Sequence, residues 1–224
     1  MRRIAIIGAG GFARELRWLM SEIASDSDLR YEPFDVAGFL VSDRGKLGSR
    51  DSEILGEFDW LDDNHVDALA MGIGTPAARL KVASELKQRF PAIEWPAIVH
   101  PSVRFDASTC KLEEGVILCA GVIASVNIVF EAFSMVDMLC TIGHEARIGA
   151  GSAIYRSANI SGGDQIGKGV LVGTGAQILQ YLTIGDHAIV GAGAVVTNDI
   201  GPMTTVVGIP AKPLVRSAEK CISD

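Results

Sequence analysis

The sequence lacks the features that mark several large classes of protein. It has no run of basic residues, and its 20 lysines and arginines are outnumbered by 27 aspartates and glutamates, for a net charge of −7. This balance argues against a nucleic-acid partner. The four cysteines (Cys110, Cys119, Cys140 and Cys221) show no Cys-x-x-Cys spacing, and the four histidines are too scattered for a ligand set. We therefore expect no bound metal.

Long apolar segments are also missing. The run at the start of the chain, Ile4–Ile7, is too short for a secretory signal or a membrane span. We expect a cytoplasmic protein with reduced cysteines and no membrane partner. Apolar residues nevertheless make up 48% of the 224 residues, which is enough for one large or two modest cores.

What the sequence does contain is a six-residue period in its second half. Every sixth residue from position 112 to position 196 is apolar, and the register never slips. The fifteen residues are Leu112, Leu118, Ala124, Phe130, Val136, Ile142, Ile148, Ile154, Ile160, Ile166, Val172, Ile178, Ile184, Val190 and Val196. The residue four positions after each of them is mostly small or apolar, and the residue directly after is often glycine.

This period matches neither a helix nor a simple strand. It predicts a parallel β-helix, in which three hexads form one triangular coil of about eighteen residues and the coils stack into a prism. The large aliphatic side chains fill the prism. The alternative is an aliphatic-rich β domain with chance spacing, and fifteen positions in register argue strongly against it.

The first part of the chain has a different pattern. The buried strand expected at Ile4–Ile7 leads into a glycine-rich turn, Gly8–Ala13, and then into a helix over Arg14–Met20. Strand, turn and helix start fit the nucleotide-binding fingerprint G-x-G-x-x-A, in which glycines let the backbone approach a phosphate. A tight strand-to-helix turn without a ligand is the alternative.

Further elements are expected downstream. They are strands at 35–41 and 67–73, a helix at 81–90 and an extended segment at 93–99. This amounts to about half of a dinucleotide-binding sheet, which is sized for one nucleotide or a nucleotide-linked sugar. The acidic residue expected at the end of the second strand is missing, because Val41 and Ser42 stand there. A redox role with NAD therefore fits poorly.

These patterns predict two domains. Residues 1–95 form an α/β half-Rossmann domain that binds the nucleotide sugar, and residues 96–224 form the β-helix with an irregular tail after Val196. Prolines at 96 and 101 favour a boundary there. The β-helix is expected to begin before Leu112, near Val103, in a less regular coil.

One hexad carries candidate chemistry. In Ile142–Arg147 the inward positions are Ile142 and Ala146, so His144 and Glu145 project outward from a rigid coil. An imidazole of near-neutral pKa can act as a general base, and a neighbouring carboxylate raises its basicity and orients it. The alternative is a solvated surface histidine. His187, which projects outward in a later coil, is the natural control.

Coil arithmetic places Gly162 one coil beyond His144. The segment Ser161–Asp164 breaks the smooth repeat, with a polar Asp164 in a small-residue position. A pair of glycines beside a base leaves room for a thioester, and their N–H groups can stabilise an oxyanion. The alternative is a local bulge.

Taken together, these motifs resemble the sialic-acid and amino-sugar O- and N-acetyltransferases of the left-handed β-helix superfamily. The resemblance spans nearly the whole chain. Its motifs are Gly8–Ala13, Gly72–Thr75 with Arg79, Ile98–Ser102, the hexads, His144–Glu145 and Gly208–Lys212. The hexads alone indicate only a hexapeptide acyltransferase, whereas the first part of the chain together with His144–Glu145 is more specific.

The resemblance implies a homotrimer with active sites at the subunit interfaces, acting in glycan biosynthesis. His144 would be the general base, Glu145 its partner and Gly162 the oxyanion donor. The implied nucleotide-sugar contacts are Gly8, Gly10, Gly11, Phe12 and Gly74. Acetyl-CoA, the implied co-substrate, would lie along the later coils, with main-chain contacts at Thr174 and Ala192.

Two departures from the family pattern stand out. Relatives often carry a second histidine nine residues after the base, which touches acetyl-CoA; that position is Ala153 here. The acidic pair after the second strand is replaced by Val41–Ser42, which leaves the nucleotide open. An N-acetyltransferase acting on a nucleotide-linked amino sugar is the leading interpretation. A sugar O-acetyltransferase, an acyltransferase for another acceptor and a non-catalytic β-helix scaffold are the alternatives.

Overall fold

The structure is a computed structural model that describes residues 1–25, 33–46 and 53–214. Its first part is a small α/β unit. The elements are β1 (Arg2–Ile7), α1 (Gly11–Ser25), β2 (Phe34–Val41), a short 3-10 helix (Arg44–Lys46), β3 (Ile54–Glu57), α2 (Trp60–Asp63), β4 (Ala68–Met71) and α3 (Pro76–Arg89). Cys221 lies outside the described residues.

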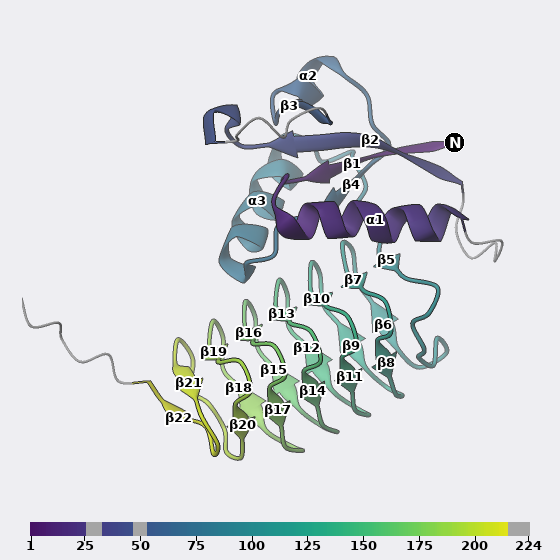
Figure 1. The fold of residues 1–224 in the computed structure, drawn as a ribbon. Helices are drawn as coiled ribbons and strands as arrows, with labels where there is room; N and C mark the ends of the chain where they lie inside the picture. The colour runs from purple at the N-terminus through teal and green to yellow at the C-terminus, as the bar shows by residue number, and fades with distance from the viewer. Residues whose placement is uncertain (26–32, 47–52, 215–224) are drawn as a thin grey trace, which may run out of the picture.

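The four strands form one parallel sheet in the order β3-β2-β1-β4. Both of its faces are covered, which is why Ile4–Ile7 of β1 and all of β4 are continuous apolar runs rather than alternating ones. Helix α1 lies on one face and buries Leu16, Leu19 and Ile23 there. Helices α2 and α3 lie on the other face (Figure 1).

The predicted half-Rossmann sheet is confirmed, with some differences in its elements. Helix α1 is longer than expected, and α3 begins at Pro76 rather than near residue 81, because proline suits the first turn of a helix. Strand β3 and helix α2 were not predicted. Of the extended segment expected at 93–99, only Ile98–Val99 is a strand, and Glu94 makes an isolated bridge to Ala68.

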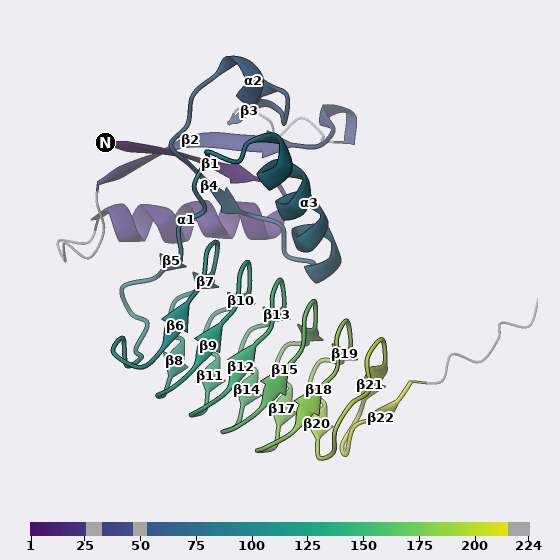
Figure 2. The ribbon, with the colours of Figure 1, turned by 180° about the vertical axis from the view of Figure 1, so that it is seen from behind.

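The second part is a three-sided prism of short strands. In chain order these are β5 (Ile98–Val99), β6 (Lys111–Leu112), β7 (Ile117–Leu118), β8 (Ile123–Ala124), β9 (Val129–Phe130), β10 (Met135–Val136), β11 (Thr141–Ile142), β12 (Arg147–Ile148), β13 (Ala153–Ile154), β14 (Asn159–Ile160), β15 (Gln165–Ile166), β16 (Leu171–Val172), β17 (Gln177–Ile178), β18 (Thr183–Ile184), β19 (Ile189–Val190), β20 (Val195–Val196), β21 (Thr205–Val207) and β22 (Lys212–Pro213). Every third strand joins the same sheet (Figures 1 and 2).

The eighteen-residue coil is confirmed by the strand register. Thr141 pairs with Asn159, and Asn159 pairs with Gln177. Every six-residue position from Leu118 to Val196 is buried in one continuous core, and Leu112 in the first coil is partly buried. The period therefore reports which side chains fill the prism, as predicted.

The two ends of the prism depart from the period. It begins earlier, as expected: β5 pairs with β7, and Val103 is buried in the core. At the far end the tail is more regular than expected, because β21 pairs in parallel with β19 and β22 pairs antiparallel with β21. Val206 follows its partner Val190 by sixteen residues instead of eighteen, so a strict six-residue count misses this coil.

The two parts pack directly on each other. Helix α1 lies between its own sheet and the prism (Figure 2). Its apolar side chains share one buried cluster with Ile117, Met135 and Ala153 of the prism. Glu94 is the last residue that bridges to the α/β sheet, and Ile98 is the first that pairs within the prism. The domain boundary between residues 95 and 96 stays a prediction.

Asp164 is a charged side chain inside the prism. Its Oδ2 accepts a hydrogen bond from the Ser161 N–H at 3.0 Å, and its Oδ1 accepts one from the Leu182 N–H at 2.9 Å. Burial raises the pKa of Asp164 to about 6, and the two N–H donors oppose part of that rise. The strand ladders run through this turn in register, so the bulge considered as an alternative does not form.

We predict that Asp164→Asn removes part of the pH dependence of stability. The folded-state pKa of about 6 lies above the ordinary value of 3.8, so the folded protein binds this proton more tightly than the unfolded chain. The contribution of Asp164 to stability should therefore be fully present below pH 3.8 and be lost as the pH rises through 6. The loss relative to Asp164→Asn should be about 1–3 kcal/mol. Urea unfolding at a series of pH values measures it, and equal slopes in both proteins would contradict the prediction.

Candidate active site

The turns between strands stack into three corners of the prism. The His144 corner contains the turns that follow β8, β11, β14 and β17. The Thr174 corner contains those that follow β10, β13, β16 and β19. The sheet that holds β7, β10 and β13 faces the α/β unit, and the His144 corner joins the other two sheets on the far side.

His144 projects from its corner as expected. Its side chain is 51% exposed, and Nδ1 lies 3.4 Å from Oε2 of Glu145. This separation is long for a hydrogen bond, as is common in unliganded sites. Glu145 has a φ of 60°, and its N–H donates to the carbonyl of Val126 in the preceding coil. The turn is thereby fixed, and Nε2 of the imidazole lies next to Gly162 of the following coil.

Gly162 lies directly against this imidazole. A Cβ built on Gly162 would lie 2.5 Å from Nε2 of His144, so no larger residue fits without moving the ring. The neighbouring Gly163 N–H donates to the carbonyl of His144 at 2.7 Å. Within the described part of the chain the Gly162 N–H has no acceptor. The expected stacking of Gly162 on His144 is therefore seen in the geometry, and its catalytic role stays a prediction.

The residues expected to contact the acyl donor fall elsewhere. Thr174 and Ala192 are exposed and stack on each other at the Thr174 corner, where the Gly193 N–H donates to the carbonyl of Thr174. Ala153 is fully buried in the cluster shared with helix α1. Within one protomer its side chain is therefore out of reach of a donor on the surface.

The residues expected to hold the nucleotide do come together. Gly8 has a φ of 95°, a conformation that favours glycine. The Gly10 carbonyl accepts a hydrogen bond from the Arg14 N–H in the first turn of α1. A Cβ built on Gly10 or Gly11 would meet nothing within 4 Å. Phe12 packs close to Gly74, where a built Cβ would lie 3.7 Å from the Cβ of Phe12. The turn is open at the start of α1.

A single protomer divides the predicted site residues into three groups, of which the first lies far from the third. The first group is His144, Glu145 and Gly162 on the far side of the prism. The second is Thr174 and Ala192 at the Thr174 corner, one and two coils beyond Arg156, which pairs with Glu15 of α1. The third is the turn from Gly8 to Phe12 with Gly74, at the carboxyl ends of β1 and β4.

The other histidines occupy different settings. His187 is exposed at the third corner, in the position that Glu145 rather than His144 occupies within its turn. His100 lies 3.2 Å from a carboxylate oxygen of Glu22 and 2.7 Å from Oγ of Ser102. His65 pairs with Asp67 at 3.1 Å. In the described residues no group of three or more His, Cys, Asp or Glu side chains could hold a metal.

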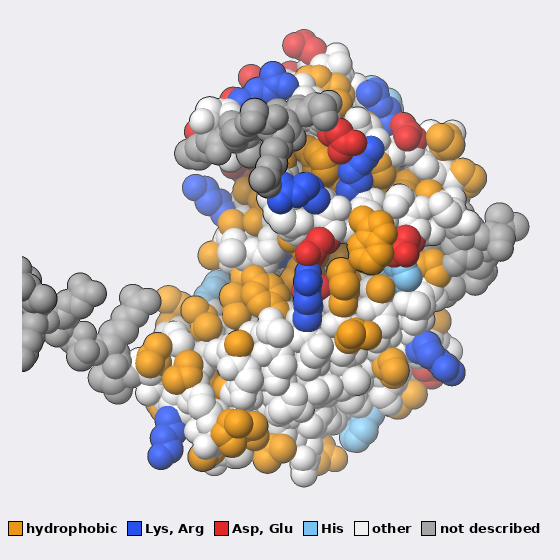
Figure 3. All heavy atoms as spheres, in the orientation of Figure 1, with side chains coloured by type: hydrophobic (Ala, Val, Ile, Leu, Met, Phe, Trp, Pro, Cys, Tyr) orange, Lys and Arg blue, Asp and Glu red, His pale blue; other side chains and the backbone are white. Residues whose placement is uncertain are grey.

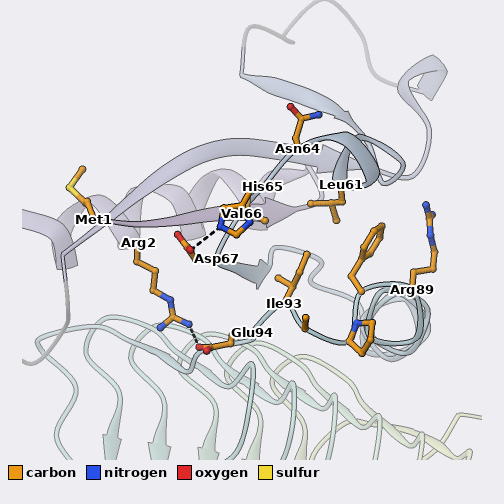
Figure 4. Close-up of a pocket in the computed structure, with 13 residues that line it drawn as sticks. Met1, Arg2, Leu61, Asn64, His65, Val66, Asp67, Arg89, Ile93 and Glu94 are labelled. Atoms are coloured by element: carbon orange, nitrogen blue, oxygen red, sulfur yellow. Dashed lines mark hydrogen bonds and ion pairs between the residues drawn. The ribbon is translucent and has the colours of Figure 1, made fainter.

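A broad groove of about 1130 Å³ lies at the opposite end of the α/β sheet from the glycine-rich turn. Arg2, Glu94, His65 and Asp67 line it, and Figure 4 shows that these four form two pairs with each other. Its charged groups already have partners, and it lies at the amino ends of the strands, where ligands of open α/β sheets do not bind.

No helix of the described chain is long and apolar enough to cross a membrane.

Sequence reasoning missed two residues that now stand out at the seam between the two parts. Arg79 had been noted only as part of a motif, and it is fully buried there. Tyr155 directly follows an aliphatic position, where the hexads often have glycine. A tyrosine in place of that glycine was the signal in the sequence that could have identified this position.

Comparison with known proteins supports the repeat. The family model for the bacterial transferase hexapeptide (six repeats) matches residues 165–198. Serine acetyltransferase from Bacillus subtilis (strain 168) is 33% identical over 91 residues, which cover 37% of this chain and 42% of that enzyme. The chain thus spans less than half of the length of this curated relative.

Several solved structures cover almost all of the chain, and two of them illustrate the likeness. PerB from Caulobacter crescentus, in complex with CoA and GDP-perosamine, has a TM-score of 0.83 and 24% identity, covering 96% of this chain and 98% of its own. WeeI from Acinetobacter baumannii AYE has a TM-score of 0.66 and 27% identity, covering 96% and 100%. These likenesses confirm the fold class, a half-Rossmann unit followed by a left-handed parallel β-helix.

Proposed function

We propose that this chain is a hexapeptide-repeat acyltransferase and that it transfers the acetyl group of acetyl-CoA to the amino group of a nucleotide-linked amino sugar. The observation that carries the proposal is the arrangement at the His144 corner. An exposed imidazole stands there beside an N–H group, that of Gly162, which has no acceptor in the described chain. A base and an oxyanion donor side by side are what direct acyl transfer needs.

The proposed reaction is a single displacement. The acceptor amine attacks the thioester carbonyl while Nε2 of His144 takes a proton from its nitrogen. The carbonyl oxygen becomes an oxyanion, and the Gly162 N–H donates to it. The C–S bond then breaks, the thiolate of CoA takes the proton from the imidazolium, and the amide is released. Glu145 orients the ring and stabilises its protonated form.

The binding residues follow from the predicted site groups. The turn at Gly8, Gly10, Gly11 and Phe12, with Gly74, would hold the nucleotide, because its open backbone sits at the start of a long helix. The exposed backbone of Thr174 and Ala192 would hold acetyl-CoA along the later coils. The complex of PerB with CoA and GDP-perosamine supports this pair of substrates by analogy of fold.

A homotrimer would bring the base of one protomer to the nucleotide turn and donor contacts of another. The base and the nucleotide turn lie on different sides of one protomer, so an interface between protomers is the place where they can meet. Apolar side chains surround the His144 corner in exposed positions, with Ile123 54% and Tyr181 69% exposed. In the view of Figure 3 most charged side chains lie over the α/β unit and its seam, and the prism below carries few. Such a surface suits packing against another protomer.

Acceptor chemistry is tested with a panel of nucleotide sugars. Release of free CoA thiol is measured with acetyl-CoA and matched pairs of UDP-, GDP- and dTDP-sugars that carry either an amine or a hydroxyl at the same carbon. Turnover only with amino sugars supports the proposal, and turnover only with hydroxyl sugars would replace it with O-acetylation. A lack of turnover with both would favour a non-catalytic scaffold.

We predict that His144→Ala lowers kcat by about 10²–10⁴-fold, the usual effect of losing a general base. The control is His187→Ala, because His187 is an equally outward histidine at another corner. It should retain near wild-type turnover. Steady-state thiol release measures both variants. Equal turnover in His144→Ala and wild type would remove His144 from the mechanism.

Gly162→Ala should also lower kcat, by about 10²-fold or more, because the new methyl group must displace the imidazole and would crowd the oxyanion. A Cβ at Gly162 is 2.5 Å from Nε2, whereas one at Gly201 meets only Oγ1 of Thr204 at 3.7 Å. Gly201→Ala is therefore the matched control and should be silent. Thermal unfolding should differ little between the two variants, which separates a local effect from misfolding.

The protein is predicted to sediment as a trimer, at three times the 23.7 kDa mass of one chain. Ile123→Lys, which places a charge in the exposed apolar surface near His144, should weaken assembly and lower activity together. Analytical ultracentrifugation over a concentration series reads out the mass. A fully active monomer would rule out a site shared between protomers.

A further inference from the structure

Tyr155 projects from the prism toward the nucleotide turn. It follows β13 on the side that faces the α/β unit, and it packs on the same buried cluster as Ala9 and Phe12. The chain therefore places an aromatic side chain of the second part against the glycine-rich turn of the first. At the equivalent position one coil later the residue is Gly173.

The hydroxyl of Tyr155 ends beside Gly74. A Cβ built on Gly74 would lie 3.9 Å from the Tyr155 oxygen and 3.7 Å from the Cβ of Phe12, so Phe12, Gly74 and Tyr155 meet at one point. Tyr155 is half-buried, yet its hydroxyl has no hydrogen-bond partner among the described residues. Burial raises the pKa of Tyr155 above its ordinary value of 10, so the phenol is a proton donor at neutral pH.

A buried positive charge lies next to these residues, because the guanidinium carbon of Arg79 is 6.0 Å from the centroid of the Phe12 ring. Arg79 is fully buried, and its guanidinium donates to the carbonyls of Phe133 at 2.9 and 3.0 Å and of Ile73 at 2.7 Å. All these acceptors are neutral, and no carboxylate within the described chain pairs with it. Burial lowers the pKa of Arg79 to about 10, which leaves it charged at neutral pH.

The surrounding charges leave the cation of Arg79 uncompensated. The carboxylates of Glu15 and Asp137 both form ion pairs with Arg156. The Asp137 carboxylate lies 3.0 Å from Nε of Arg156. Helices α1 and α3 both begin at this point, and neither has an acidic residue in its first turn. The positive ends of their dipoles therefore add to the charge of Arg79.

We propose that Tyr155 is a ligand-contacting residue of the acceptor site, whose hydroxyl donates a hydrogen bond to the diphosphate of a nucleotide sugar held at Gly10–Phe12. Arg79 supplies the positive potential beneath the same diphosphate and holds the loop through Gly74 against the prism. This inference rests on the proposed function. It adds a contact from the prism to a nucleotide site otherwise built by the α/β unit, so the ligand would span both parts of the chain.

The test is Tyr155→Phe, which removes only the hydroxyl and keeps the packing. Binding of GDP, UDP and dTDP to the full chain is measured by calorimetry. The Kd of the best-bound nucleotide should rise about 10–100-fold, the range for losing a hydrogen bond to a charged group. In turnover assays the KM for the nucleotide sugar should rise by a similar factor, with kcat and the KM for acetyl-CoA unchanged.

Ser21→Ala is the matched control, because it removes a hydroxyl from the same seam helix α1 away from the nucleotide turn. It should leave the Kd unchanged. Equal nucleotide affinity in Tyr155→Phe and wild type would overturn the assignment and leave Tyr155 as a packing residue. If wild type binds none of the three nucleotides, the nucleotide-sugar acceptor itself fails, which is a distinct result.

Discussion

The parallel ladder between coils is the constraint from which the rest of this structure follows. Between β6 and β20 the paired strands lie eighteen residues apart, so a turn residue lies above the equivalent residue of the preceding coil. Inward side chains must fit a prism of fixed width, whereas corner residues are free to vary. Functional residues can therefore occupy the corners at no cost to the core. This explains why His144 and Gly162, which would not fit at an inward position of the prism, lie within a regular repeat.

The seam between the α/β unit and the prism is held by helix packing and by one buried arginine rather than by a repeated ladder. Helix α1 covers its own sheet on one side and the prism on the other, and the buried Arg79 joins the carbonyl of Ile73 to that of Phe133. A desolvated guanidinium held by neutral acceptors is costly unless its hydrogen bonds are complete. The seam therefore specifies one orientation of the α/β unit on the prism, and with it the position of the nucleotide turn over the sheet that contains β13.

The sequence predicted what depends on local or periodic pattern. The hexads identified the core of the prism because each inward position repeats the same steric demand, and the run before Gly8 identified β1 because both faces of that strand are covered. Strand β3 was missed because it is short and contains Gly56. The last coil was missed because it is two residues shorter than the others. Tyr155 and Arg79 gain their meaning only from residues far away in the chain, so no local pattern could reveal their contacts.

The remaining question is how an exposed histidine could become an effective base. His144 and Glu145 are 51% and 60% exposed, and a pair so open to water contributes little, because solvent screens its charges. A hydrated N–H at Gly162 would likewise be a weak oxyanion donor, since its strength depends on the exclusion of water. Both groups need a cover that the single chain does not provide. The exposed apolar side chains around this corner are the natural place for that cover to pack, so in this fold catalytic strength would arise with assembly rather than within one protomer.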